Sequence, residues 1–271
     1  MVINRENVIE IIEKSGLKPD KDYGQNYLLD SNACFNIVEL LGLCENDTIL
    51  EVGPGLGSLT HFICEKKYQK FDLVDIDFRM IDFLKIIYSN EHNNFIVSDI
   101  RKHDVSQYTK IIGNLPYNIT TETVLYLVEN GLHAQRMVLM CQAEAFARFS
   151  DKSGKEYGPL SILITLLGTV KRRMTIKPGA FYPAPKCSSI VFTIDFDGNF
   201  DRELAIETYK FAKTLFLNRR KTIYNNLSSL LNNKELALNV LNNAGILPNK
   251  RPEEVLPNQY VSLFKQAEPY L

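Results

Sequence analysis

The sequence predicts an α/β domain with a mostly parallel sheet, followed by a small all-helical domain. Short apolar runs alternate with helical patterns over the first two thirds of the 271 residues, which is typical of βαβ units. A turn cluster at residues 197–199 ends this alternation, and only helical patterns follow it. We therefore expect one domain over residues 1–197 and a second over residues 198–271.

Each expected strand is a short apolar run, and each expected helix carries apolar residues with a period near 3.6. The strands are expected at 48–52, 71–76, 95–97, 110–112, 135–141 and 188–194. The helices between them are expected at 59–66, 80–88, 121–129, 144–149 and 159–170. The C-terminal helices are expected at 203–216, 221–231, 234–244 and 258–267.

The composition predicts a soluble, cytoplasmic protein with no membrane partner. Residues 1–14 mix charged residues into their apolar positions, so they do not resemble a signal peptide. The apolar run at 160–170 is far shorter than the roughly 20 residues that span a bilayer. The five cysteines have no C-x-x-C spacing, which predicts core thiols in a reducing compartment.

Charge is unevenly distributed along the chain. The whole sequence has a net charge of −1, whereas residues 165–225 hold 11 Lys and Arg against 5 Asp and Glu. Such a stretch can form a surface that holds phosphates, and it can equally be a solvated basic face. Charge alone leaves both interpretations open.

A glycine-rich loop follows the first predicted strand. Glu51-Val-Gly53-Pro-Gly55-Leu-Gly57 leaves a strand and opens a helix, and its glycines allow a tight turn and a close approach to a ligand. The spacing is G-x-G-x-G rather than the G-x-G-x-x-G of dinucleotide sites. Glu51 also suits a cationic ligand better than a pyrophosphate.

Acidic residues end the next two strands. Asp75 and Asp77 lie about twenty residues beyond the loop, where a carboxylate accepts hydrogen bonds from ribose hydroxyls. Asp99 ends the third strand and can accept a bond from an adenine amine, while Ile100 packs on the ring. Together they favour an adenosine-containing ligand at the carboxyl edge of the sheet.

The segment Asn114-Leu-Pro-Tyr117 ends the fourth strand and is a variant of the Asn-Pro-Pro-Tyr motif of amino-group methyltransferases. An adenine amine is a poor nucleophile because its lone pair is delocalised into the ring. The Asn114 side-chain carbonyl and the Leu115 backbone carbonyl can accept its two protons and favour the developing positive charge. Tyr117 offers a ring on which the base can stack.

These motifs and several later ones resemble, in order, those of the ribosomal RNA adenine dimethyltransferases of the KsgA type. The resemblance covers nearly the whole chain and implies a Rossmann-like S-adenosylmethionine-dependent methyltransferase domain with a small helical RNA-binding domain. The segments that carry it are 24–28, 51–60, 114–119, 142–148, 157–161, 181–186, 218–227 and 251–254.

The resemblance implies a role for each matching position. The expected catalytic residues are Asn114, Leu115, Pro116, Tyr117 and Phe181, with the two aromatic rings on either side of the flipped base. The expected cofactor-binding residues are Gln25, Asn26, Leu28, Glu51, Gly53, Gly55, Asp75, Ile76, Asp99, Ile100 and Asn114. The basic residues that we expect to bind RNA are Lys171, Arg172, Arg173, Lys186, Arg219, Arg220 and Lys221.

The implied reaction is the N6,N6-dimethylation of two adjacent adenosines in the 3′-terminal hairpin loop of small-subunit (16S) ribosomal RNA during ribosome biogenesis. The implied cofactor is S-adenosylmethionine, no metal is implied, and the expected partner is the immature small subunit. We expect a monomer. The chain departs from the family in having Asp75 where Glu is usual, and in a near-neutral charge that bears on the strength and salt dependence of RNA binding.

Two other functions fit parts of the sequence. An erythromycin-resistance-type methyltransferase, which modifies one adenine of large-subunit (23S) RNA, shares the implied fold and mechanism, but its loop more often reads Asn-Ile-Pro-Tyr and it lacks the pattern at 218–222. A ribosome-assembly or transcription factor with reduced catalysis is the second alternative. The intact glycine loop and the motif at 114–117 argue against complete loss of catalysis.

Overall fold

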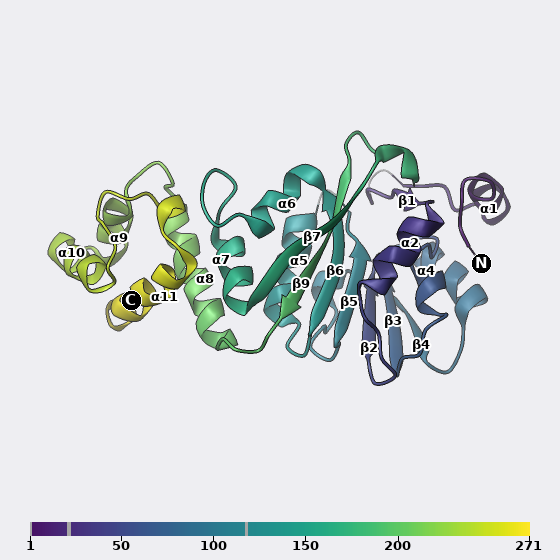
Figure 1. The fold of residues 1–271 in the computed structure, drawn as a ribbon, viewed down its shortest axis with the longest axis horizontal. Coiled ribbons are helices and arrows are strands. Elements are labelled where there is room, and N and C mark those ends of the chain that lie inside the picture. The colour runs from purple at the N-terminus through teal and green to yellow at the C-terminus, as the bar shows by residue number, and fades with distance from the viewer. Residues whose placement is uncertain (1, 21–22, 117–118) are drawn as a thin grey trace. The chain divides into compact units, whose positions relative to one another are not determined.

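The computed structural model describes residues 2–20, 23–116 and 119–271 (Figure 1). The chain forms two compact units. The first contains residues 1–146 and 171–195, and the second contains residues 147–170 and 196–271. Residues 147–170 thus pack with the C-terminal helices, although they precede the domain boundary expected after residue 197. The division into a catalytic and an RNA-binding domain stays a prediction.

A seven-stranded sheet dominates the first unit, in the order β4-β3-β2-β5-β6-β9-β7. The strands β2 to β6 run parallel to their neighbours, and β9 is antiparallel to β6. The strands are β2 (Thr48–Val52), β3 (Lys70–Asp75), β4 (Asn93–Val97), β5 (Lys110–Asn114), β6 (Arg136–Gln142), β7 (Gly168–Ile176) and β9 (Ser189–Phe196). The strand order reverses between β2 and β5, which opens a crevice at the carboxyl ends of these two strands.

Helices and two short strands complete the first unit. The helices are α1 (Val8–Ser15), α2 (Ser31–Glu39), α3 (Thr60–Ile63), α4 (Phe78–Tyr88), η1 (Ile100–Lys102), α5 (Thr120–Asn130) and η2 (Pro178–Ala180). Helix α6 (Ala143–Ser150) crosses from this unit into the second. Strands β1 (Tyr27–Leu28) and β8 (Phe181–Tyr182) pair antiparallel and join the N-terminal segment to the loop after β7.

The sheet is apolar because helices bury it. Five strands each place a residue of at most 1% exposure in one hydrophobic core: Ile49, Leu73, Ile112, Val138 and Val191. No helix in the described ranges is both long and apolar enough to cross a membrane.

The second unit is a helical bundle. Its elements are α7 (Pro159–Leu167), α8 (Arg202–Phe216), α9 (Ile223–Leu231), α10 (Lys234–Asn243), η3 (Pro252–Glu254), α11 (Pro257–Ala267) and η4 (Glu268–Tyr270). Buried aromatic residues hold it together, since Tyr157 donates a hydrogen bond to the Val255 carbonyl (2.8 Å) and Tyr260 donates one to Pro252 (2.9 Å). Both phenolic oxygens therefore have partners inside an apolar core.

The predicted α/β class and the six expected strands are confirmed, but part of one expected helix was wrong and several elements were not predicted. The helix expected at 159–170 ends at Leu167, and residues 168–176 form β7 instead. This strand carries three successive exposed basic residues, which hide the period of two that marks a strand. Helices α1 and α2 were not predicted. The β1–β8 pair was not predicted either, because two-residue strands depend on tertiary partners.

Candidate active site at the carboxyl ends of the strands

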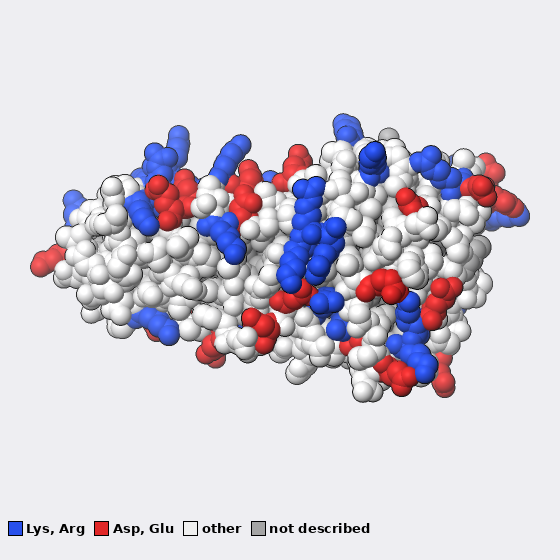
Figure 2. Space-filling view, viewed as in Figure 1, with Lys and Arg blue, Asp and Glu red and all other residues white. Residues whose placement is uncertain are grey.

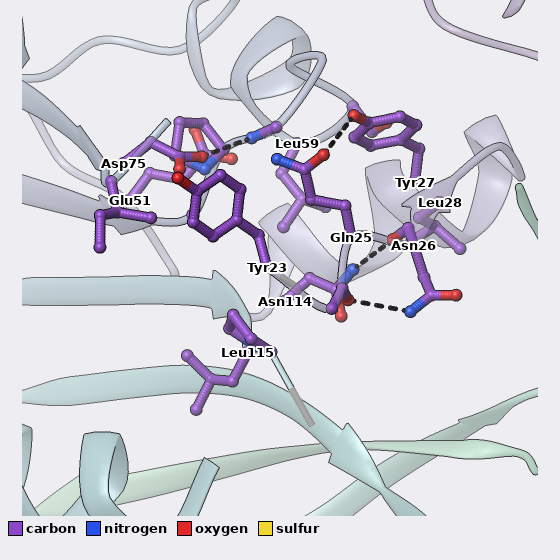
Figure 3. A pocket seen from close by; sticks show the side chains of 17 residues that line it. Tyr23, Gln25, Asn26, Tyr27, Leu28, Glu51, Leu59, Asp75, Asn114 and Leu115 are labelled. Carbon is purple, nitrogen blue, oxygen red and sulfur yellow. Dashed lines mark hydrogen bonds between the residues drawn. The ribbon is translucent and has the colours of Figure 1, made fainter. Parts of the chain in front are cut away.

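A pocket opens at the carboxyl ends of β2, β3 and β5, where the strand order reverses (Figure 3). Four segments line it: the N-terminal stretch before β1, the loop after β2, the end of β3 and the end of β5. The lining residues are Tyr23, Gly24, Gln25, Asn26, Tyr27, Leu28, Glu51, Gly53, Pro54, Gly55, Ser58, Leu59, Asp75, Ile76, Asn114, Leu115 and Pro116.

The loop after β2 has the backbone that the glycine spacing predicts. Gly53 and Gly55 have φ angles of +64° and +56°, a region that favours glycine. A Cβ on Gly55 would lie 3.2 Å from the ring of Tyr27, so any side chain there would press on the N-terminal segment. The loop therefore offers bare backbone to a ligand in the pocket.

Glu51 is a buried carboxyl on the floor of the pocket. It is 1% exposed and accepts a hydrogen bond from the Thr60 hydroxyl at 2.7 Å. Burial, with a smaller contribution from the nearby Asp75 carboxylate, raises the pKa of Glu51 to about 8. A cation in the pocket would favour the ionised form, so the site fits a positively charged ligand.

Asp75 ends β3 at the rim of the pocket. Its carboxylate accepts hydrogen bonds from the Asp77 amide (3.0 Å) and the Gly55 amide (3.4 Å). Burial nevertheless raises the pKa of Asp75 to about 6. Beside it, Ile76 is 50% exposed and lines the same pocket. A carboxylate next to an exposed apolar side chain can bind a ligand that has hydroxyl groups and a flat ring.

The N-terminal segment is tied to the end of β3 through Gln25. The Gln25 amide donates to the Asp77 carboxylate at 3.0 Å, and its oxygen accepts from the Tyr27 hydroxyl at 3.0 Å and from the Asp20 amide at 2.9 Å. Arg79 also pairs with Asp77 at 2.7 Å, and this pairing keeps the buried carboxylate ionised. Gln25 therefore anchors a wall of the pocket, and its expected contact with the cofactor stays a prediction.

Asn114 at the end of β5 is held in one orientation. Its amide nitrogen Nδ2 donates to the backbone carbonyl of Asn26 at 3.0 Å (Figure 3). A backbone carbonyl only accepts hydrogen bonds, so this contact fixes which end of the Asn114 amide faces it. The oxygen Oδ1 is then the end of the side chain that can accept a hydrogen bond from a substrate. The preceding Gly113 is required, because a Cβ there would lie 2.7 Å from the Val52 carbonyl.

The other residues of the loop after β5 are only partly described. Leu115 and Pro116 line the pocket, and the Leu115 amide donates to the Met140 carbonyl at 3.0 Å. Leu115 is 1% exposed as a whole residue, and the expected contact of its carbonyl with the substrate stays a prediction. Tyr117, expected to stack on the base, lies outside the described residues.

Three expected site residues do not line this pocket. Asp99 accepts two hydrogen bonds from the Arg101 guanidinium (3.0 and 2.7 Å), and Ile100 is 6% exposed. Phe181 is 4% exposed, pairs with Leu28 across the β1–β8 ribbon and packs into the sheet core. A stacking role for Phe181 would need its ring to become accessible. The expected roles of these three residues stay predictions.

The expected RNA-binding residues fall into both units. Lys171, Arg172 and Arg173 lie exposed on β7, and Lys186 is exposed in the loop before β9. In the second unit Arg220 and Lys221 are also exposed.

Arg219 differs from these exposed residues, because its guanidinium is used inside the second unit. It donates to the carbonyls of Lys155 (2.7 Å) and Gly154 (3.1 Å) and lies over the Phe216 ring. Arg219 therefore has a structural role that the basic pattern did not reveal.

Some pocket residues were not predicted individually. Tyr23 and Gly24 precede Gln25, and Ser58 and Leu59 follow the glycine loop. In the sequence, these residues could have been identified as pocket residues because they lie next to motifs already recognised. Within the described parts of the chain, no group of three His, Cys, Asp or Glu residues is placed to hold a metal ion.

Comparison with known proteins agrees with this geometry. The family model described as "Ribosomal RNA adenine dimethylase" matches residues 16–268. The chain is 32% identical to the Ribosomal RNA small subunit methyltransferase A of Mycoplasma mycoides subsp. mycoides, over 92% of this chain and 97% of the relative.

Two solved structures share the fold. A dimethyladenosine transferase from Plasmodium falciparum is 21% identical, with a TM-score of 0.75 over 88% of this chain and 96% of its own. The 23S rRNA methyltransferase ErmE is 19% identical, with a TM-score of 0.67 over 89% of this chain and 99% of its own. At these identities the likeness concerns the fold alone.

Proposed function

The chain belongs to the ribosomal RNA adenine dimethylase family, and we propose that it dimethylates the N6 amines of two adjacent adenosines in small-subunit ribosomal RNA. The observation that carries the proposal is the orientation of Asn114, whose Nδ2 is bonded to the Asn26 carbonyl at 3.0 Å at the edge of the pocket. The enzyme is a methyltransferase, and its cofactor is S-adenosylmethionine.

The pocket residues fit this cofactor. When bound, S-adenosylmethionine supplies an electrophilic methyl group on a positively charged sulfur. Asp75, with its carboxylate at the rim of the pocket, is placed to accept hydrogen bonds from ribose hydroxyls, and the exposed Ile76 offers an apolar contact to a base. Glu51 is buried in the same pocket, and its carboxylate would be ionised beside a cation. The glycine loop leaves room for close backbone contact.

Asn114 would act on the target amine through its free end. With Nδ2 held by Asn26, Oδ1 would accept a hydrogen bond from one amine N–H, and the Leu115 backbone carbonyl would accept one from the other. Both bonds strengthen as the amine becomes positively charged, so they stabilise the transition state more than the ground state. The methylated amine loses its extra proton to solvent after transfer, so this scheme requires no general base with a shifted pKa.

We propose further that the enzyme acts in the cytoplasm as a monomer on the immature small subunit. The name of the Mycoplasma relative supports the small subunit as the substrate. The likeness to ErmE is one of fold, and no contact in the described part of the pocket favours large-subunit RNA.

A methyl-transfer assay tests the proposal. Labelled S-adenosylmethionine would be incubated with undermethylated small subunits, large subunits and naked RNA, and the modified base would be mapped. We expect dimethyladenosine in the 3′ hairpin of the small-subunit RNA. Label confined to large-subunit RNA would reassign the substrate. Tight binding to small subunits without any label would instead indicate an assembly factor.

A further inference from the structure

A cluster of basic side chains lies on the sheet outside the pocket. Arg136 from β6 and Lys171 and Arg173 from the edge strand β7 surround Asp195 of β9, and we call these four residues the Asp195 cluster. The carboxylate of Asp195 lies 2.5 Å from Arg136 Nε, 3.6 Å from Arg173 Nη2 and 3.8 Å from Lys171 Nζ. Three cations share one carboxylate, so the cluster has a net positive charge.

The cluster is both accessible and held in place. The side chains of Arg136, Lys171 and Arg173 are 34%, 53% and 31% exposed, whereas Asp195 is 22% exposed. Arg173 also donates to the Thr193 hydroxyl at 3.0 Å, and Arg136 donates to the Leu40 carbonyl at 3.0 Å. Two of the three cations therefore lose little side-chain freedom when an anion binds, which favours binding.

The positive surface continues along β7. Arg172 is exposed and donates to the Thr175 hydroxyl at 2.7 Å. Figure 2 shows Lys and Arg side chains gathered over this part of the sheet. Beyond the strand, a groove is lined by two cationic and two anionic residues, so it adds no net charge to this surface. Its charged residues are Arg5, Glu6, Asp30 and Lys177.

Backbone pairing connects the carboxyl end of β7 to the pocket, whereas the Asp195 cluster lies toward the opposite edge of the sheet, where Arg136 begins β6. After β7 the chain passes through η2 into β8, and β8 pairs with β1 in the register Leu28 to Phe181. The Leu29 amide also donates to the Ala180 carbonyl at 2.7 Å. Tyr27 and Leu28 of β1 line the pocket, so the groove and the pocket lie on neighbouring parts of one ribbon.

We propose that the Asp195 cluster and Arg172 bind the phosphodiester backbone of the RNA strand that leads to the target adenosine. The proposal rests on the proposed function, since it assigns the substrate path to the same pocket. Guanidinium groups bind phosphate oxygens with directed, charge-assisted hydrogen bonds. Successive side chains of a strand alternate between its two faces, so Lys171 and Arg173 extend to the Asp195 side, about 6.6 Å apart, and Arg172 extends to the other face of the edge strand β7. The surface supplies a local attraction that the net charge of −1 conceals.

Three variants with the same change in net charge test the proposal. Arg172→Glu removes the cation outside the cluster, and the pair Lys171→Gln with Arg173→Gln removes two cations while Arg136 still pairs with Asp195. Lys85→Glu, on an exposed position of α4, is the matched control. Methylation of undermethylated small subunits would be measured against RNA concentration and salt, with thermal unfolding recorded to show that each variant is folded.

We expect the first two variants to raise the KM for RNA roughly tenfold at low salt and to reduce the salt slope of binding by about 1 to 2. The kcat at saturating RNA and the KM for S-adenosylmethionine should stay within about twofold of wild type, as for Lys85→Glu. Unchanged RNA KM and salt slope in both folded variants would overturn the proposal, and so would an equal effect of the control. Failure of the proposed function looks different, because wild type itself would not dimethylate the small subunit.

Discussion

The pocket and the Asp195 cluster lie in the same unit but are built in different ways. The pocket takes its polar groups from short motifs at strand ends, such as residues 51–55 and 114–116, where a few adjacent residues carry the chemistry. The cluster joins residues about 35 and 60 positions apart, which meet because Arg136 and Asp195 are opposite each other in the β6–β9 register. A local motif reveals the first kind of site, whereas strand pairing alone reveals the second.

This difference predicts a difference in mutational effect. Groups in the pocket are buried, directed by backbone contacts and aimed at reacting or cofactor atoms, so their loss should change kcat or the KM for cofactor. The three cations of the cluster are partly exposed and act through their charge, so their loss should change the KM for RNA in proportion to the charge removed. The following experiments test that contrast.

The largest effect is expected for Asn114→Ala. The variant removes the oxygen that would accept the amine proton, and loss of one such preorganised contact costs about 10²- to 10³-fold in kcat. RNA binding should stay within about twofold of wild type, as measured by filter binding at fixed salt. Single-turnover methylation would provide the rate. Retained wild-type turnover would rule out the assigned role of Asn114, and a matching loss of RNA affinity would remove the contrast with the cluster.

Much of this pocket was predictable from sequence because each motif is local. The G-x-G-x-G loop requires the positive φ angles seen at Gly53 and Gly55, and Asp75 ends a strand whose apolar run is plain. The orientation of Asn114 was not predictable, because its partner is a backbone carbonyl 88 residues earlier. A basic pattern likewise could not separate the exposed Arg220 from Arg219, whose partners are carbonyls about 65 residues away.

Asp75→Asn is expected to have the next largest effect. It replaces an acceptor of two amide hydrogen bonds by a neutral group, and charged hydrogen bonds contribute about 1.5 to 3 kcal/mol each. We expect the KM for S-adenosylmethionine to rise roughly 10- to 100-fold while the KM for RNA is unchanged. Asp75→Glu, which restores the residue usual in the family, should raise it only a few-fold. Equal effects of both variants would show that shape rather than charge matters at this position.

Arg219→Ala and Arg220→Ala should separate structure from RNA binding in the second unit. Arg219 donates to two carbonyls and packs on Phe216, so its loss should lower the free energy of unfolding by about 1 to 2 kcal/mol. Arg220 is exposed, so its loss should change stability by less than about 0.5 kcal/mol and act on RNA affinity alone. Urea unfolding and RNA binding would be measured on both. Identical stability of the two variants would contradict the structural role of Arg219.

The smallest effect is expected from a change in pH, which should alter cofactor affinity and stability gradually. In the free protein the pKa of Glu51 is raised to about 8 by burial, and a bound cation favours its ionised form. Cofactor affinity should therefore fall as pH drops below 8, by at most tenfold per pH unit, and Glu51→Gln should flatten that dependence.

The free energy of unfolding of the free protein should change with pH in the opposite sense to the cofactor affinity. The folded state holds a proton on Glu51 that the unfolded chain has released between pH 4.5 and 8, so this contribution grows as pH falls through that window and is lost as pH rises.

Calorimetric titration of the cofactor and urea unfolding of the free protein, both between pH 5.5 and 8.5, would measure these opposite slopes. Glu45→Gln, in an exposed ion pair with Lys67, is the control that removes a carboxylate without burial. If Glu51→Gln left both slopes unchanged, the pH dependence would belong to another group, of which Asp75 with its pKa of about 6 is the nearest in the pocket.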